Sequence, residues 1–303
     1  MKQRVSSLLC ILLLTSAAAF ARAEGHFDRT LTISGAVNFD LNTGSGSVTI
    51  RTGGANQVVI QGRVTSGDWW GGDADAAVRS VESNPPIEQN GGTIRVGYNL
   101  PEDAKHHVAI SYEITLPPDT TLQVNTGSGD ISAEGVRGSA KLHTGSGSIR
   151  ARDLGRDSHL ETGSGSIHAD SVVAPLFAST GSGSIQAELT GSGDVDVHTG
   201  SGSIDVRGVN GALRARTGSG HIGADGSPKG AWQVQSGSGD VRLALGSAGG
   251  GFDMNLHTGS GSIHSDLPIT VQGTMGKHEL KGSVRGGGPE VEVSTGSGSI
   301  DIR

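Results

Sequence analysis

Residues 144–149 read Thr-Gly-Ser-Gly-Ser-Ile, and close variants of this unit, Thr-Gly-Ser-Gly-(Ser/Asp)-(Ile/Val), recur through residues 126–303. Successive copies lie 18 or 19 residues apart as far as Ser236, which replaces the threonine, and then 22 and 37 residues apart. Such regularity predicts a repeat protein in which each unit buries its apolar face against its neighbours. The copies begin at Thr43, Thr126, Thr144, Thr162, Thr180, Thr199, Thr217, Ser236, Thr258 and Thr295.

Apolar residues flank each copy at every second position. Ala140 and Leu142 precede Thr144, and Ile149 and Ala151 follow it. An alternation of period two is typical of a strand with one buried face. We therefore expect two short strands in each coil of about 18 residues, and two facing sheets. The fold class is all-β: a single-chain β-solenoid of the parallel β-helix or β-roll type, with a right-handed coil as the commoner choice.

The glycines of the unit are predicted to form the corners of the coil, because glycine adopts positive φ without steric cost. We expect the threonine and the middle serine to turn inward and to bond backbone groups of the neighbouring coil, since buried polar backbone groups need partners. Residues eight after the threonine should stack outward with mostly opposite charges, as in Glu134, Arg152 and Asp170. The predicted corner glycines are Gly127, Gly129, Gly145, Gly147, Gly163, Gly165, Gly181, Gly183, Gly200 and Gly202.

The first 23 residues have the features of a secretory signal peptide. Lys2 and Arg4 precede an apolar run at residues 8–20, and Ala21-Arg22-Ala23 fits a cleavage site. Cleavage after Ala23 would remove the one cysteine, so the exported chain would carry no disulfide. No later run is long and apolar enough for a transmembrane segment. We expect an exported protein in the periplasm, at the cell surface or outside the cell.

Two further regions are expected to form one continuous domain. Residues 24–125 should hold N-terminal strands, the first coil and a capping insertion between Thr43 and Thr126, with a short helix near residues 73–81. Residues 126–303 should form the regular solenoid. The chain stops on a predicted strand at residues 299–303 with no evident cap, so we expect that edge to pair with a partner or a second copy.

Composition excludes an ordinary globular core, because 51 of 303 residues are glycine and only 3% are aromatic. Without residues 1–23 the chain has 20 basic and 30 acidic residues, a net charge of −10. This balance argues against nucleic acid as a partner, since a basic stripe is expected there. The charges are scattered, so acidity indicates solubility more than a particular ligand.

The chain resembles the bacterial putative-adhesin family, a Toastrack-like domain of unknown function. Residues 108–118 (Val-Ala-Ile-Ser-Tyr-Glu-Ile-Thr-Leu-Pro-Pro), residues 122–131 (Leu-Gln-Val-Asn-Thr-Gly-Ser-Gly-Asp-Ile) and the repeated unit carry the resemblance. It extends over roughly residues 30–303. The resemblance implies a β-solenoid and a cell-envelope setting, and it implies no catalytic residues.

Calcium binding is one alternative, because calcium β-rolls also place Gly-rich corners at nine-residue intervals. They use an aspartate after the second glycine, and here serine holds that site in most coils. Only Asp130, Asp194 and Asp240 are acidic there, whereas calcium needs six to eight oxygens including carboxylates. We therefore disfavour a calcium-binding β-roll.

Other chemistry is also disfavoured, and no cofactor is expected. His143, His198 and His257 share one predicted column, yet no two are neighbours in it, which argues against a transition-metal site. A polysaccharide-acting solenoid enzyme would need clustered carboxylates on one face, and we expect no histidine–aspartate pair beside one serine. Ice binding would need outward threonine ladders, whereas these threonines are expected inside.

The favoured hypothesis is a non-catalytic envelope or surface protein that presents a rigid solenoid for binding or adhesion. Its partner would be an envelope protein, a glycan or another copy of the chain. Trp69 and Trp70 form the one aromatic pair that could act as a sugar platform, and a hydrophobic plug on the capping insertion is the favoured alternative for them.

Overall fold

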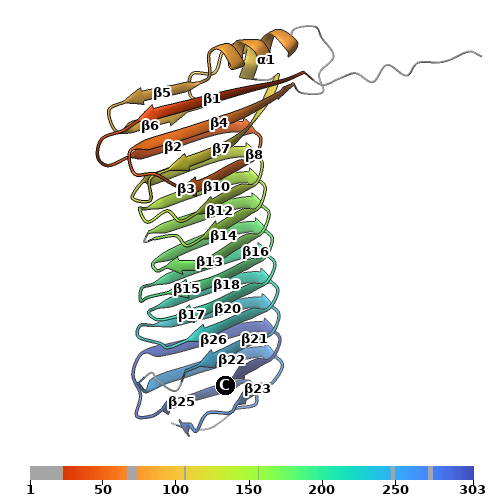
Figure 1. Cartoon of the computed structure of the whole chain (residues 1–303). Coiled ribbons are helices and arrows are strands. Elements are labelled where there is room, and N and C mark those ends of the chain that lie inside the picture. Colours follow the sequence, from red (N-terminus) through yellow and green to blue (C-terminus); the bar gives the residue numbers. More distant parts are fainter. Residues whose placement is uncertain (1–22, 67–73, 106, 156, 247–249, 272–275) are drawn as a thin grey trace, which may run out of the picture.

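The computed structural model describes residues 23–66, 74–105, 107–155, 157–246, 250–271 and 276–303. Within them, two sheets of 13 and 14 strands, here sheet A and sheet B, run along an elongated stack (Figure 1). Each regular coil contributes one strand to each sheet, and consecutive coils pair in parallel. The prediction of an all-β solenoid is confirmed. The handedness of the coil stays a prediction.

The regular coils lie at residues 121–245 and follow the predicted order. Their sheet B strands are β8 (Thr121–Ser128), β10 (Ala140–Ser146), β12 (Ser158–Ser164), β14 (Leu176–Ser182), β16 (Val195–Ser201), β18 (Leu213–Ser219) and β20 (Trp232–Ser238). Their sheet A strands are β9 (Ile131–Glu134), β11 (Ile149–Arg152), β13 (Ile167–Val173), β15 (Ile185–Thr190), β17 (Ile204–Val209), β19 (Ile222–Gly226) and β21 (Val241–Leu245).

The core lies between the two sheets and is made of small and medium side chains. In β10 and β11 the alternate residues Ala140, Leu142, Ile149 and Ala151 are all buried. Leu142, Ile149 and Ala151 pair in register with an identical residue of the next coil, and Ala140 pairs with the buried Ser158. Stacking therefore buries apolar area that no single coil could hide, at roughly 25 cal/mol per Å².

The threonines form the predicted ladder between coils. Thr162 is buried and donates its hydroxyl to the carbonyl oxygen of Gly147 in the preceding coil, at 2.7 Å. This satisfies a backbone oxygen that the corner would otherwise leave unpaired. The equivalent bond, at 2.7–2.9 Å, is made by Thr144, Thr162, Thr180, Thr199, Thr217, Ser236, Thr258 and Thr295.

The prediction that the middle serine turns inward is wrong. The strand continues through the first glycine and ends at the serine, just before the bend at the second glycine, and the serine side chain at this end of the strand is exposed to solvent. Ser146, Ser164 and Ser182 are exposed, and Ser164 is in register with Ser182. The serines thus form a hydroxyl row along the outside of this edge.

The glycines of the unit are required for two different reasons. The second glycines Gly129, Gly183 and Gly202 have φ of 155°, 153° and 149°, a region that favours glycine. The first glycines lie within the sheet B strands, where the limit is space. A Cβ on Gly163 would lie 2.5 Å from the carbonyl oxygen of Gly145, so any side chain would push the coils apart.

At the N-terminal end, both sheets extend beyond the first coil, which consists of β2 (Asn38–Ser45) and β3 (Val48–Thr52). Helix α1 (Ala74–Ser83) lies across this end (Figure 1), and its Val78 and Val81 are buried. Sheet A continues with β7 (Val108–Leu116), β4 (Gln57–Ser66) and β1 (Glu24–Thr32), and sheet B with β6 (Thr93–Val96) and β5 (Ile87–Asn90). A second short helix is α2 (Glu102–Lys105).

At the C-terminal end, the prediction of an open last strand is wrong. The final strands β26 (Glu290–Ser297) and β27 (Ile300–Ile302) lie inside the sheets. They fill the coil position between β20/β21 and the earlier strands β22 (Phe252–Ser260) and β23 (Ile263–Ser265). The chain skips one position after β21 and fills it last, which accounts for the repeat spacings of 22 and 37 residues.

The terminal strand therefore needs no external partner, because β27 pairs in parallel with β21 on one side and β23 on the other. On sheet B, the outer edge of β22 is paired by the antiparallel strand β25 (Glu279–Val284), followed by β24 (Thr270–Val271). The strand that ends sheet A at this end is β23, which is three residues long.

Candidate functional site on the outer face of sheet B

One outward column of sheet B carries the most varied side chains of the regular coils. Its residues lie three positions before the ladder threonine, and the strand alternation turns them away from the core. Parallel pairing in constant register brings them side by side, one per coil. In order along the stack they are Gln123, Lys141, His159, Phe177, Asp196, Arg214 and Gln233.

A second outward column, two positions earlier, contains small residues, and the height difference makes a groove. Pro175, Ala212 and Ala231 line its low side, and the volume of the depression is about 600 Å³. A volume of this size, lined by apolar surface with a few polar groups, is typical of ligand sites. We call it the sheet B groove; it runs across β10, β12, β14, β16, β18 and β20, along the axis of the solenoid.

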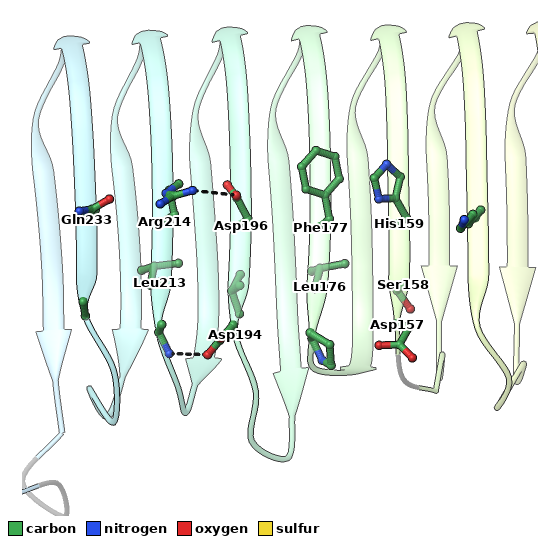
Figure 2. Close-up of a pocket in the computed structure, with 15 residues that line it drawn as sticks. Asp157, Ser158, His159, Leu176, Phe177, Asp194, Asp196, Leu213, Arg214 and Gln233 are labelled. Atoms are coloured by element: carbon green, nitrogen blue, oxygen red, sulfur yellow. Dashed lines mark hydrogen bonds and ion pairs between the residues drawn. The ribbon is translucent and has the colours of Figure 1, made fainter. Parts of the chain in front are cut away.

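Two aromatic rings lie side by side in this groove (Figure 2). The rings of His159 and Phe177 are 4.2 Å apart between centroids and only 12° from parallel. His198, in the next column, meets Phe177 edge-on at 5.3 Å. Phe177 is half-buried, so the pair offers an apolar strip to solvent in an otherwise polar surface. This strip was not singled out from the sequence, although the coil period of 18 residues gives His159 and Phe177 the same position in adjacent coils.

Charged groups of both signs flank the aromatic strip. Arg214 Nη1 lies 3.7 Å from Asp196 Oδ2 (Figure 2). Asp194 accepts a hydrogen bond from the backbone N–H of Ala212 at 3.1 Å, which fixes its carboxylate at the low side of the groove. Lys141 and Asp157 line the far end. Both donors and acceptors of hydrogen bonds therefore face one channel.

A histidine–carboxylate cluster borders the groove. Glu161 lies between His143, at 3.5 Å, and His159, at 3.1 Å, and His198 shares a hydrogen bond of 2.8 Å with Ser179. The parallel register places His143 beside Glu161 and His198 beside Ser179. Within the described ranges, no group of three or more histidine, cysteine or acidic side chains could hold a metal ion.

The three aspartates weighed as calcium ligands have a structural role. Asp130 accepts a hydrogen bond from the backbone N–H of Ser148 at 2.8 Å, and Asp240 accepts one from Ser299 at 2.9 Å. Asp194 likewise accepts a hydrogen bond from the backbone N–H of Ala212. Each carboxylate thus joins its corner to the neighbouring coil.

The structure does bring one serine, histidine and aspartate together, contrary to expectation. Ser203 Oγ is 2.9 Å from His221 Nδ1, and His221 Nε2 is 3.6 Å from Asp205 Oδ2. Acyl transfer also needs free N–H donors for the oxyanion beside the nucleophile. Here the N–H groups of residues 202, 203 and 204 donate to Ser219 O, Ser184 Oγ and His221 O. The arrangement therefore lacks an oxyanion hole on the chain around Ser203.

Trp69 and Trp70, the sequence-based candidates for a sugar platform, lie outside the described residues. The predicted corner glycines line the serine row at the other edge of sheet B, away from the residues that line the groove. Among the described helices, none has the length and apolar character needed to cross a membrane.

The chain is a β-solenoid with a groove on the outer face of sheet B. The chain belongs to the Toastrack DUF4097 family, whose model matches residues 85–303. No curated protein matches the chain.

Two solved structures resemble the chain along its length. One is a putative cell adhesion protein from Clostridium sporogenes ATCC 15579, with 15% identity, coverage of 92% of this chain and 98% of that chain, and a TM-score of 0.25. The other is a putative adhesin from Bacteroides fragilis NCTC 9343, with 13% identity, coverage of 92% and 97%, and a TM-score of 0.24. Scores of this size do not establish a shared arrangement of the strands.

Proposed function

We propose that this protein is exported and acts as a non-catalytic binding protein of the cell envelope, with the sheet B groove as its ligand surface. The observation that carries the proposal is the groove itself, an aromatic strip between donors and acceptors on an otherwise repetitive scaffold. Parallel strands fix every lining residue in register, so the site is formed before a ligand arrives. Preorganisation of this kind lowers the entropic cost of binding.

The central experiment measures binding of purified residues 24–303 to isolated cell envelopes in a sedimentation assay. Arg214→Glu reverses a charge in the groove and should reduce binding at least ten-fold. Gln186→Glu introduces a charge on the exposed outer face of sheet A and is the matched control, which should bind like the parent. Equal binding by all three proteins, or by none, would refute the groove as the ligand surface.

Location is a separate part of the proposal, supported by the signal-like residues 1–23. Protease treatment of intact cells, with a periplasmic protein as control, separates the two exported locations. Cleavage while the control survives means exposure at the cell surface. Resistance until the outer membrane is opened means a periplasmic binding role.

The catalytic alternative is tested directly. Incubation with envelope polysaccharide should produce no new reducing ends, and a fluorophosphonate probe should leave Ser203 unlabelled because no oxyanion hole supports attack. Labelling that disappears in Ser203→Ala, or new reducing ends above a heat-treated control, would overturn the non-catalytic assignment.

A further inference from the structure

The ligand of the sheet B groove has to be recognised through side chains. Strands β10 to β20 each have a parallel neighbour on both sides, so their backbone N–H and C=O groups are engaged in the sheet. An extended peptide gains most of its affinity by adding a strand to a free edge. No such edge borders the groove, which argues against a peptide strand as its occupant.

The charges of the lining also narrow the ligand class. The lining holds two cations, Lys141 and Arg214, and three carboxylates, Asp157, Asp194 and Asp196, so neither sign is in large excess. A polyphosphate or an anionic lipid surface would be attracted to an excess of Lys and Arg, which is absent from this lining. Mixed donors and acceptors instead suit an uncharged ligand with many hydroxyl groups.

The aromatic strip supplies the apolar surface that a sugar ring needs for packing. Sugar rings have an apolar face of C–H bonds, which packs against the apolar surface of aromatic side chains. His159 and Phe177 are stacked on each other, with centroids 4.2 Å apart, and lie on adjacent coils, which are about 4.8 Å apart in any sheet. The strip is therefore comparable in size to one sugar ring, and hydrogen-bonding groups continue on both sides of it.

We propose that the sheet B groove binds a linear, uncharged polysaccharide chain that lies along the solenoid axis. The exposed part of the stacked Phe177–His159 pair packs against the C–H face of one sugar ring, while Asp196, Arg214 and Gln233 bind hydroxyl groups of the following rings. The inference rests on the proposed function, since it names the ligand of the same groove.

The test uses residues 24–303 and envelope polysaccharide that has been freed of protein by protease treatment. Isothermal titration with the parent should show saturable binding. Phe177→Ala removes the aromatic ring and should weaken binding at least ten-fold. Phe177→Trp keeps an aromatic ring and should retain binding. Val173→Ala, at an exposed apolar residue outside the groove, is the matched control and should bind like the parent. Circular dichroism of each variant establishes that it is folded.

Chemical treatment of the envelope separates this inference from the proposed function. Periodate cleaves the diols of sugars, so oxidised polysaccharide should no longer bind. Envelope binding that depends on Arg214 but survives periodate and is lost after protease would overturn the polysaccharide inference and leave a protein-binding groove. Binding of polysaccharide that Phe177→Ala leaves unchanged would also overturn the inference.

Discussion

At the residue scale, the same position repeats in many coils but does not always have the same surroundings. The hydroxyl of Thr126 is buried without a hydrogen-bond partner, although eight equivalent residues donate to a glycine oxygen. The preceding coil here is β2/β3, and its Gly46 has φ of 124°, compared with 155° in Gly129. The junction between the N-terminal strands and the regular coils therefore breaks the ladder at one step.

This difference yields a matched pair of substitutions. Thr162→Val removes the bond to Gly147 and leaves a buried oxygen unpaired, which should lower the free energy of unfolding by about 1–2 kcal/mol. Thr126→Val removes no bond and eliminates a buried hydroxyl without a partner, so it should leave the free energy of unfolding unchanged or raise it by up to about 1 kcal/mol. Urea unfolding of both variants measures the difference. Equal losses would mean that the hydroxyl ladder contributes nothing specific.

Tyr112 is the other buried side chain with an unpaired hydroxyl. It is 1% exposed, packs edge-on against Phe27 at 6.2 Å, and has no hydrogen-bond partner in the described part of the chain. Tyr112→Phe should raise the free energy of unfolding by about 1 kcal/mol at neutral pH, because a desolvated hydroxyl without a partner is costly. Thermal unfolding checks this, and a destabilised variant would show that a solvent molecule serves the hydroxyl.

The pH dependence of the same variant has a predictable sign. Burial raises the pKa of Tyr112 far above its usual range, and burial together with the hydrogen bond to Asp40 raises the pKa of Tyr98 to about 12. The unfolded chain ionises its tyrosines near pH 10, as free tyrosine does. The free energy of unfolding is therefore highest below about pH 10. It decreases as the pH rises further, because the tyrosine hydroxyls then release their protons in the unfolded state and keep them in the folded state.

Above about pH 10, the free energy of unfolding should decrease less in the Tyr112→Phe variant than in the parent protein. Ultraviolet titration of the folded variant should show its one remaining tyrosine ionising near pH 12. A transition near pH 10 in the folded variant would contradict the shielding of Tyr98.

At the element scale, the C-terminal strands act as an inserted coil. The inward residues of β26 and β27, Val291, Val293, Ile300 and Ile302, are buried between coils formed by earlier parts of the chain. Strands β20 and β22 have no direct pairing with each other, and both pair with β26. The attachment of β22 to the solenoid therefore depends on the last fourteen residues of the chain.

Deletion of residues 290–303 should release β22 to β25 from the stack and leave the coils up to β18 folded. Hydrogen exchange should become fast in residues 252–284 and stay slow in residues 140–219. A synthetic peptide of residues 288–303 should restore the protection, whereas a scrambled peptide should not. Slow exchange of residues 252–284 in the truncated protein alone would contradict the inserted order of the strands.

At the scale of the whole molecule, stability is nearly a sum over coils and the interfaces between them. A central coil has two neighbours, while the strand β23 at the end of sheet A has one and is only three residues long. The rigid middle of the stack is also where the sheet B groove lies. Binding there requires no rearrangement of the coils.

Native-state hydrogen exchange should therefore be slowest in β12 to β18 and fastest among the strands in β23. The reason is that opening a central coil breaks two interfaces, whereas an end strand frays alone. Protection of β23 equal to that of β14 in a dilute sample would contradict this gradient. A rise of β23 protection with protein concentration would show that a second copy covers this edge.

The repeat, the two strands per coil, the inward residues and the threonine ladder could all be predicted from the amino-acid sequence. These features depend on local alternation and on a fixed period, which neighbouring copies reinforce. Leu142 and Ile149, for example, could be assigned to the core from their spacing alone. The resemblance carried by residues 108–131 and the repeated unit also led to the family that the comparison then established.

The order of the last coils and the sheet B groove became apparent only from the three-dimensional structure. The insertion of β26 between β20 and β22 is a long-range pairing, and the parallel register would be equally satisfied in either order. The sheet B groove depends on the relative height of two columns and on the approach of His159 to Phe177 across coils. Such features arise from residues 18 or more positions apart, and no local pattern of hydrophobicity records them.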